Sequence, residues 1–223
     1  MNLAVDIGNT AAKWALFDGR TLVRHGADNL PKADRTLVCA SGMLPEWCAG
    51  YQVLTADTPL PIRLDYKTPA TLGADRIAAA CGAWGLHAGE PCLIVDAGTC
   101  ITVDYLDADG VYHGGAIMPG LKMSLAALNT FTAKLPLVDI DGVTKAAVLG
   151  RSTEESIVAG TLGATMLALA GFVAMYKEKN PALHVLLTGG DAERLTRAGA
   201  TGWELVPTLT LCGLNEIMMY DEE

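Results

Sequence analysis

Two apolar runs of this chain carry nearly the same residue pattern, ninety positions apart. Each run reads as a buried strand that ends in an aspartate, with a glycine two residues later and small hydroxyl or amide residues beside it; the runs are Leu3–Thr10 and Leu93–Cys100. Glycine at such a corner permits a tight turn and lets a phosphate approach the backbone closely. The near-repeat therefore predicts one phosphate-binding corner made twice, with a cleft between the two that holds a nucleoside triphosphate.

The pattern of apolar and polar positions predicts the same order of elements in each half: strand, corner, strand, turn, strand, then helix. In the first half we expect strands at 2–7, 12–18 and 21–26, a short strand at 36–40 and a helix at 74–88. In the second half we expect strands at 92–96, 100–107, 111–117 and 184–188, and helices at 121–131, 154–176 and 211–220. This is an α/β plan in which three antiparallel strands open each half.

The first half is trimmed. Only about ten residues separate its third strand from the strand at 36–40, too few for a crossover helix. Glycine and proline cluster at 85–91, which places the boundary between the halves there. We therefore predict two domains, residues 1–88 and 89–223.

Composition excludes several classes of protein. Of the 223 residues, 51% are hydrophobic and 18% are charged, which supports a full core and argues against disorder. The net charge is −9, so the chain lacks the excess of positive charge that is typical of nucleic-acid-binding proteins. The six cysteines form no C-x-x-C pair and lie in apolar segments, as reduced core thiols do.

One uncharged segment, 156–176, is long enough to span a bilayer. It is rich in Gly, Ala and Thr rather than Leu, so we interpret it as a buried helix and keep a membrane span as the alternative. Small residues recur in it three or four apart: Gly160, Ala164, Ala168 and Gly171. Such a stripe lets a second helix come close, which favours a domain or dimer interface.

The first corner offers ligands for a metal and for phosphate. Asp6 is suited to hold Mg²⁺, directly or through water, while the turn amides hold phosphate oxygens. Lys13, just beyond the corner, is placed to neutralise a phosphate. The alternative is that both corners are ordinary hairpin turns, in which Asp, Gly and Asn are common.

Three further segments have both a functional and a structural interpretation. In Gly73–Arg76, Asp75 is either a general base or a helix cap, and Arg76 binds an anion or pairs at the surface. Gly114–Gly120 is either a ligand contact or a packing corner. Leu186–Asp191 carries a glycine pair at a strand end. It is either a ligand contact, because α/β folds bind ligands at strand ends, or a plain turn.

Together these segments resemble the type III pantothenate kinases, a family of the actin/Hsp70/sugar-kinase superfamily. The residues that carry the resemblance are Asp6–Lys13, Tyr66–Arg76, Asp96–Thr99, Gly114–Gly120 and Thr188–Gly190. They cover nearly the whole chain in the family's order, and Tyr66–Arg76 is the most specific stretch. The chain departs from the family in the shortened region between Ala27 and Arg35, where a helix covers the first domain of relatives.

The resemblance implies duplicated ribonuclease-H-like (actin-like ATPase) domains and the phosphorylation of pantothenate by ATP, the first step of coenzyme A synthesis. It implies Asp75 as the catalytic base on the pantothenate hydroxyl. It implies that ATP is held by Asp6, Ile7, Gly8, Asn9, Thr10, Lys13 and Thr99, and pantothenate by Tyr66, Gly73, Ala74, Asp75, Arg76 and Thr153.

It also implies a monovalent cation, K⁺ or NH₄⁺, bound by Asp96 beside Mg²⁺ at Asp6, and a cytoplasmic homodimer in which Thr153 completes the partner's substrate site. Two alternatives remain open: a kinase for another small polyol, and a non-catalytic accessory relative.

Overall fold

The computed structural model describes residues 1–8, 11–145 and 147–221. The described chain forms two compact units, each assembled from segments that are distant in sequence. The first contains Met1–Ile94, Asp104–Gly114 and Thr208–Glu223, and the second contains Val95–Val103 and Gly115–Pro207. The division at residues 88 and 89 stays a prediction about the sequence domains.

The first unit is built on a five-stranded sheet with the order β3-β2-β1-β4-β5. The strands are β1 (Asn2–Ile7), β2 (Ala12–Asp18), β3 (Thr21–Gly26), β4 (Arg35–Ala40) and β5 (Gln52–Val53). β1 pairs antiparallel with β2 and parallel with β4, while β2 pairs antiparallel with β3. The predicted antiparallel opening of the first half is therefore confirmed.

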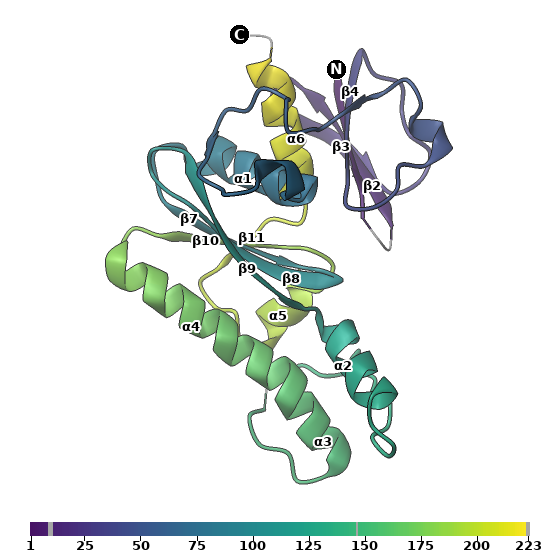
Figure 1. The fold of residues 1–223 in the computed structure, drawn as a ribbon, viewed down its shortest axis with the longest axis vertical. Helices are drawn as coiled ribbons and strands as arrows, with labels where there is room; N and C mark the ends of the chain where they lie inside the picture. Colours follow the sequence, from purple (N-terminus) through teal and green to yellow (C-terminus); the bar gives the residue numbers. More distant parts are fainter. Residues whose placement is uncertain (9–10, 146, 222–223) are drawn as a thin grey trace. The chain divides into compact units, whose positions relative to one another are not determined.

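Two helices cover one face of this sheet, namely α1 (Ala74–His87) and α6 (Leu209–Tyr220). They lie side by side in Figure 1, although the second comes from the end of the chain. A buried hydrogen bond from Asn2 Nδ2 to Asn215 Oδ1, 3.1 Å long, joins β1 to α6. Packing of the two helices on one face of the sheet buries their apolar side chains.

The opposite face has a lighter cover. Between β3 and β4 the described chain forms a loop at 27–34 in place of a crossover helix, as the short spacing predicts. Leu30 and Ala33 of this loop pack on the apolar cluster beneath, with Cys48 of the 3₁₀ turn η1 (Glu46–Cys48). The cluster consists of Leu3, Val5, Ile7, Trp14, Leu16, Val38 and Cys48. The short loop therefore covers this face of the sheet in place of a helix.

The second sheet has six strands in the order β11-β10-β7-β8-β9-β6. They are β6 (Arg63–Leu64), β7 (Cys92–Ala97), β8 (Cys100–Leu106), β9 (Val111–Pro119), β10 (His184–Thr188) and β11 (Glu204–Leu205). The expected neighbours β7, β8 and β9 are adjacent in that order. The remaining helices include α2 (Leu121–Thr130) and α5 (Ala192–Ala198), and a 3₁₀ turn, η2 (Pro69–Thr71), precedes α1.

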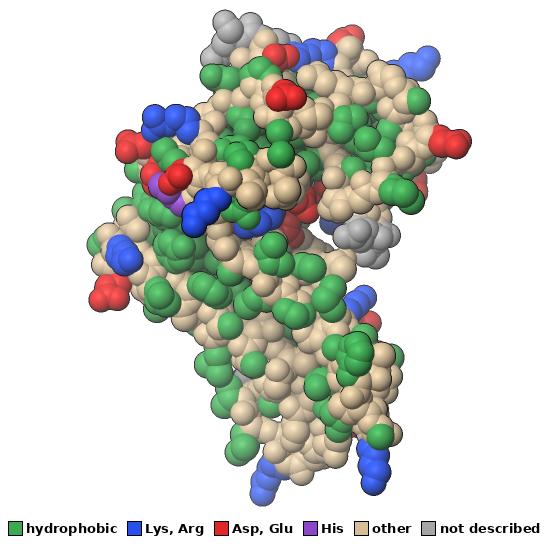
Figure 2. Space-filling view, in the orientation of Figure 1, with side chains coloured by type: hydrophobic (Ala, Val, Ile, Leu, Met, Phe, Trp, Pro, Cys, Tyr) green, Lys and Arg blue, Asp and Glu red, His purple; other side chains and the backbone are tan. Residues whose placement is uncertain are grey.

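The apolar segment predicted at 154–176 is helical from Thr153 to Lys179. It comprises α3 (Thr153–Val158), a π-helical turn η3 (Ala159–Gly163) and α4 (Ala164–Lys179). It is the one helix among the described residues that is long and apolar enough to cross a membrane, and a third of its most apolar window is buried within this chain. Leu167 and Met175 are exposed along it. Figure 2 shows hydrophobic side chains, in green, on the surface over this helix.

Candidate active site

The two predicted corners share a pattern of burial and a backbone hydrogen bond that closes the turn. Asp6 and Asp96 are each the last residue but one of their strands, and each is the half-buried member of an otherwise buried strand. The turn closes by a backbone hydrogen bond in both cases, from Gly8 N to Ala11 O (3.1 Å) and from Gly98 N to Cys100 O (2.9 Å). The sequence repeat is therefore also a repeat of burial. The turns differ in length, because the closing bond joins residues three apart in the first corner and two apart in the second.

A second backbone contact repeats as well. The carbonyl of the residue after each aspartate accepts an N–H from beyond a neighbouring strand. Ile7 O accepts from Ser41 N, directly after β4, at 3.1 Å, and Ala97 O accepts from Asp191 N, the N-cap of α5 after β10, at 2.8 Å. These bonds fix the strand ends that carry the aspartates. Two residues expected at the first corner, Asn9 and Thr10, lie outside the described residues.

Asp6 lies among charged and polar side chains on the helix-covered face of the first sheet. It pairs in register with Lys13 of β2 and with Cys39 of β4, and paired residues share one face of a sheet. The Cys39 thiol donates a hydrogen bond of 3.2 Å to Asp6 Oδ1. Burial raises the pKa of Asp6, and the nearby Asp75 charge raises that pKa further although Cys39 and Lys13 oppose the change.

This arrangement suits a magnesium ion. Burial and the nearby second carboxylate destabilise the ionised form of Asp6, which raises its pKa, and a bound cation would offset the same cost. Mg²⁺ binds through one or two carboxylates together with substrate phosphates. Asp6 thus fits the role the sequence predicts for it.

Asp75 lies in the first turn of α1, and its carboxylate folds back over the start of the helix. Its Oδ1 accepts the backbone N–H of Arg76 at 2.8 Å. The N-cap is Gly73, and a Cβ at Gly73 would lie 2.5 Å from that same oxygen. Asp75 thus does help to satisfy the helix start, and its charge lies close enough to Asp6 to raise the pKa of that residue.

Arg76 is buried and paired inside the first unit, not at the surface. Its side chain is buried and forms an ion pair with Asp104 of β8, which Tyr112 of β9 also contacts. The Tyr66 ring lies 6.0 Å from the guanidinium carbon, so two predicted substrate residues are neighbours. Sequence reasoning missed Asp104 and Tyr112; the signal available was an acid in the middle of an apolar strand.

The second corner places Asp96 against the glycine pair after β10. A Cβ at Gly189 would lie 2.4 Å from Ala97 O and 2.5 Å from Asp96 Oδ1, and Gly189 has a φ of +95°. Carboxylate and carbonyl oxygens thus gather at this point, and these are the ligands that hard cations prefer. Asp96 therefore fits the predicted monovalent cation.

Two other second-unit predictions can be placed. Thr99 is exposed, and its carbonyl accepts Gly120 N at 3.1 Å, so one end of Gly114–Gly120 packs against the corner backbone. Thr153 is exposed and is the first residue of α3. Ser152 caps that helix by accepting the N–H of Glu155 at 3.2 Å.

The cysteines follow the prediction in part. All six are free; Cys39, Cys48, Cys81 and Cys92 are buried, while Cys212 is half-buried. Cys100 is exposed because it follows the second corner, so its interpretation as a core thiol is wrong.

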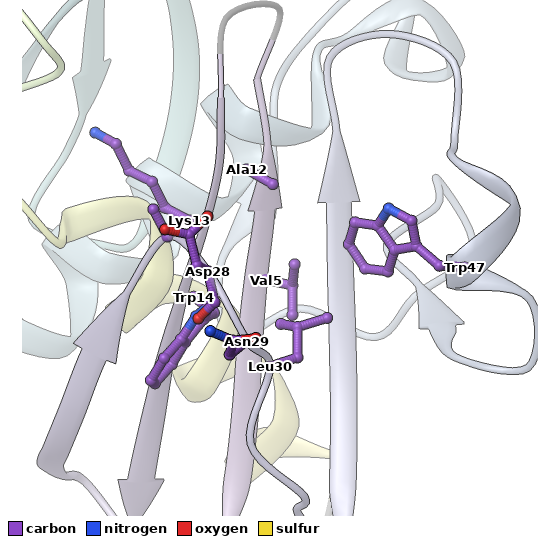
Figure 3. Close-up of a pocket in the computed structure, with 9 residues that line it drawn as sticks. Val5, Ala12, Lys13, Trp14, Asp28, Asn29, Leu30 and Trp47 are labelled. Carbon is purple, nitrogen blue, oxygen red and sulfur yellow. The ribbon is translucent and has the colours of Figure 1, made fainter.

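A pocket of about 300 Å³ lies on the opposite side of the first sheet, beside the loop at 27–34. Val5, Trp14, Leu30 and Trp47 contribute to its lining. Because side chains alternate along a strand, Val5 and Trp14 point to this face and Asp6 and Lys13 to the other. Figure 3 shows the Lys13 side chain extending away from Val5 and Trp47. Lys13 and Ala12 also contribute to the lining, so the pocket adjoins the first corner through β2.

Comparison with known proteins decides the family. The model of the type III pantothenate kinase family matches residues 30–175. The chain is a member of the type III pantothenate kinase family. The type III pantothenate kinase of Phocaeicola vulgatus is 37% identical over the full length of both chains, and that of Porphyromonas gingivalis is 40% identical over 99% of this chain and 98% of its own.

Solved structures with low identity share the fold of this type III pantothenate kinase. A conserved putative Baf family transcriptional activator from Campylobacter jejuni has a TM-score of 0.68 at 19% identity, over 99% of this chain and 98% of its own. The activator of 2-hydroxyisocaproyl-CoA dehydratase from Clostridium difficile, solved with bound ADPNP, has a TM-score of 0.55 at 16% identity, over 99% and 94%. The α/β actin-like ATPase fold predicted from the sequence is thus confirmed.

Proposed function

We propose that Asp75 is the general base through which this kinase activates the hydroxyl of pantothenate. As a member of its family the protein phosphorylates pantothenate in coenzyme A biosynthesis, using ATP. The observation that carries the proposal is that α1, whose first turn holds Asp75, packs on β4 beside the strand that carries Asp6. The Asp75 charge also contributes to the raised pKa of Asp6. A base for the acceptor alcohol has to lie close to the phosphate site, and this interaction supports that placement.

We assign ATP to the two corners. Residues Asp6, Ile7, Gly8, Asn9, Thr10 and Lys13 would hold it at the first corner and Thr99 at the second. Support comes from the shared position of the two corners, in which a glycine that permits close approach follows an aspartate at a strand end. Phosphoryl transfer depends mainly on positioning and on charge stabilisation, which amides and a lysine supply.

Asp6 would hold Mg²⁺, directly or through water, and Asp96 would hold K⁺ or NH₄⁺. When bound, such cations neutralise charge on the phosphate groups. The chain's own contribution is to fix the two carboxylates: Cys39 holds Asp6 by a hydrogen bond, and Gly189 leaves room for the Asp96 carboxylate.

Pantothenate would lie against Tyr66, Gly73, Ala74, Asp75 and Arg76. Support comes from the proximity of Tyr66 to Arg76 and from the position of the other three in the same helix start. Arg76 carries the positive charge that a substrate carboxylate needs, and Asp75 lies one residue away to accept the hydroxyl proton.

A homodimer with Thr153 contributed across the interface completes the proposal. In the single chain the small-residue stripe Gly160, Ala164, Ala168 and Gly171 is exposed, and nothing lies within 4 Å of a Cβ at Gly160 or Gly171. Exposed Leu167 and Met175 adjoin the stripe. A second copy in the cytoplasm, rather than a bilayer, would cover this apolar face.

The test of the base is Asp75→Asn. The amide keeps an oxygen that accepts the Arg76 N–H, so the helix start is preserved while the base is removed. We expect kcat to fall by a factor on the order of 10² or more, with little change in Tm or in ATP binding. A variant that turns over near the wild-type rate would remove Asp75 from this role.

A further inference from the structure

Arg76 is held by a buried partner that the substrate would not displace. Asp104 accepts hydrogen bonds from Nε of Arg76 at 3.2 Å to each carboxylate oxygen, and from Nη2 at 2.5 Å. The Arg76 side chain is 8% exposed and that of Asp104 is 2% exposed. Asp104 therefore binds the Nε and Nη2 edge of the guanidinium and does not bind Nη1, and Arg76 has a further side-chain hydrogen bond with Tyr66.

Tyr112 holds Asp104 in turn. Its hydroxyl donates a hydrogen bond of 2.7 Å to Asp104 Oδ1, inside a fully buried environment. Burial first, and then the charge of Asp104, raises the pKa of Tyr112 far above its usual value, so the phenol stays a hydrogen-bond donor. The Asp104 carboxylate is thus fixed from two sides, by Arg76 and by Tyr112.

Tyr66 closes the group. Its ring centroid is 6.1 Å from that of Tyr112 and 6.0 Å from the Arg76 guanidinium carbon. Gly114, with a φ of +82°, lies directly against this ring, because a Cβ there would be 3.0 Å from Tyr66 Cε2. All five residues belong to the first unit, so the arrangement is internal to one compact body.

We propose that Asp104 is a positioning residue for the kinase reaction: it orients Arg76 so that Nη1 meets the carboxylate of pantothenate. This inference rests on the proposed role of Arg76 in pantothenate binding. A buried ion pair is weak evidence for stability, because desolvation of the two charges offsets their attraction. Orientation is what the bidentate geometry supplies, since it fixes the plane of the guanidinium.

The group also explains why the charge on Arg76 is retained. Burial lowers the pKa of Arg76, but the hydrogen bond and charge of Asp104 more than compensate and hold that pKa above its usual value. Without Asp104 the cation would be buried and uncompensated, and its side chain would move toward water or toward another anion. Either movement would take Nη1 out of the position that we assign to it.

The experiment compares Asp104→Asn and Tyr112→Phe with the wild-type enzyme, measuring KM for pantothenate, KM for ATP, kcat and Tm. For Asp104→Asn we expect KM for pantothenate to rise about tenfold or more, with KM for ATP within about twofold of wild type. Tyr112→Phe keeps the ion pair and removes one hydrogen bond, so a smaller rise of about threefold is expected. If Asp104→Asn fails to fold, the KM of Tyr112→Phe for pantothenate tests the positioning role of Asp104.

Asn215→Ala serves as the matched control, because it also removes a buried polar partner in the first unit but at the far end of β1 from Asp6. It should lower Tm without changing either KM. If Asp104→Asn and Tyr112→Phe behave like this control, Asp104 has a structural role only and the inference is overturned.

Arg76→Ala, alone and combined with Asp104→Asn, separates this inference from the proposed site. If Asp104 acts through Arg76, adding Asp104→Asn to Arg76→Ala leaves KM for pantothenate unchanged. If Arg76→Ala raises that KM and Asp104→Asn does not, only the positioning role is lost. If Arg76→Ala leaves the KM at its wild-type value, the substrate role of Arg76 is lost with it.

Discussion

A side chain at Gly73 would collide with the carboxylate of Asp75. The Cβ would lie 2.5 Å from Asp75 Oδ1, well inside van der Waals contact. Glycine at the N-cap of α1 therefore leaves the space in which the Asp75 carboxylate folds back over the start of the helix. The position of the proposed base depends on the residue two places before it.

Gly73→Ala should displace the Asp75 carboxylate while the helix remains. Because a misplacement of about 1 Å can cost a factor of about 10² in rate, we expect kcat to fall by about 10- to 100-fold with a small change in Tm. Steady-state kinetics and thermal unfolding measure the two effects. Gly142→Ala is the matched control, since a Cβ there meets nothing within 4 Å. Equal kcat values for both variants would contradict the steric argument.

Gly189→Ala should weaken the response to the monovalent cation. The added methyl would lie 2.5 Å from Asp96 Oδ1 and 2.4 Å from Ala97 O, so the carboxylate has to move. We expect the K⁺ concentration that gives half-maximal activity to rise by about tenfold or more, as when groups that orient a metal ligand are lost. A K⁺ titration of activity at saturating ATP and pantothenate measures this. An unchanged titration curve would argue against Asp96 as the cation ligand.

His113 should make stability depend on pH. Its Nε2 lies 2.6 Å from Asp107 Oδ2 and its Nδ1 3.2 Å from Asp65 Oδ2, and the hydrogen bond to Asp107 raises the pKa of His113. Since that pKa is raised in the folded state, the stabilisation is fully present below the unfolded value of about 6.5 and is lost as pH rises through the folded pKa.

Thermal unfolding between pH 5.5 and 9 checks this expectation. The wild-type Tm should fall on the alkaline side of that unfolded value, and His113→Gln should flatten this part of the curve. The change should be small, because the His113 side chain is 38% exposed and solvent screens the pairs. A His113→Gln curve parallel to that of the wild type would show that another group titrates.

Leu167→Glu should separate the proposed dimer. Leu167 is 61% exposed and adjoins the small-residue stripe of α4, so a carboxylate there would be buried without a partner in the dimer. Light scattering should show a monomer, and kcat/KM for pantothenate should drop because Thr153 would no longer reach the partner's site. Met43→Glu is the control, since Met43 is 95% exposed in the other unit. A fully active Leu167→Glu monomer would contradict the shared site.

The sequence alone was enough to predict the strands and helices at both corners. β1, β2 and β3 begin and end where the apolar runs predict, and α1, β7 and β10 agree to within a residue. Each depends on local periodicity and on nearby glycine or aspartate, which the chain displays directly. The elements it did not predict are short, such as β5, β6 and β11, because two residues carry too little periodicity to be recognised.

Only the tertiary structure decided which distant residues meet. Helix α6, at the end of the chain, packs beside α1 on the first sheet because this buries the apolar faces of both helices. No local pattern in the sequence specifies which helix becomes the partner. The same holds for the ion pair of Arg76 with Asp104, 28 residues away, and for the hydrogen bond from Tyr112 to Asp104. The periodicity of apolar residues indicates which side of one segment is buried. The pairing of a buried charge with its counter-charge depends on the packing of segments that are distant in sequence.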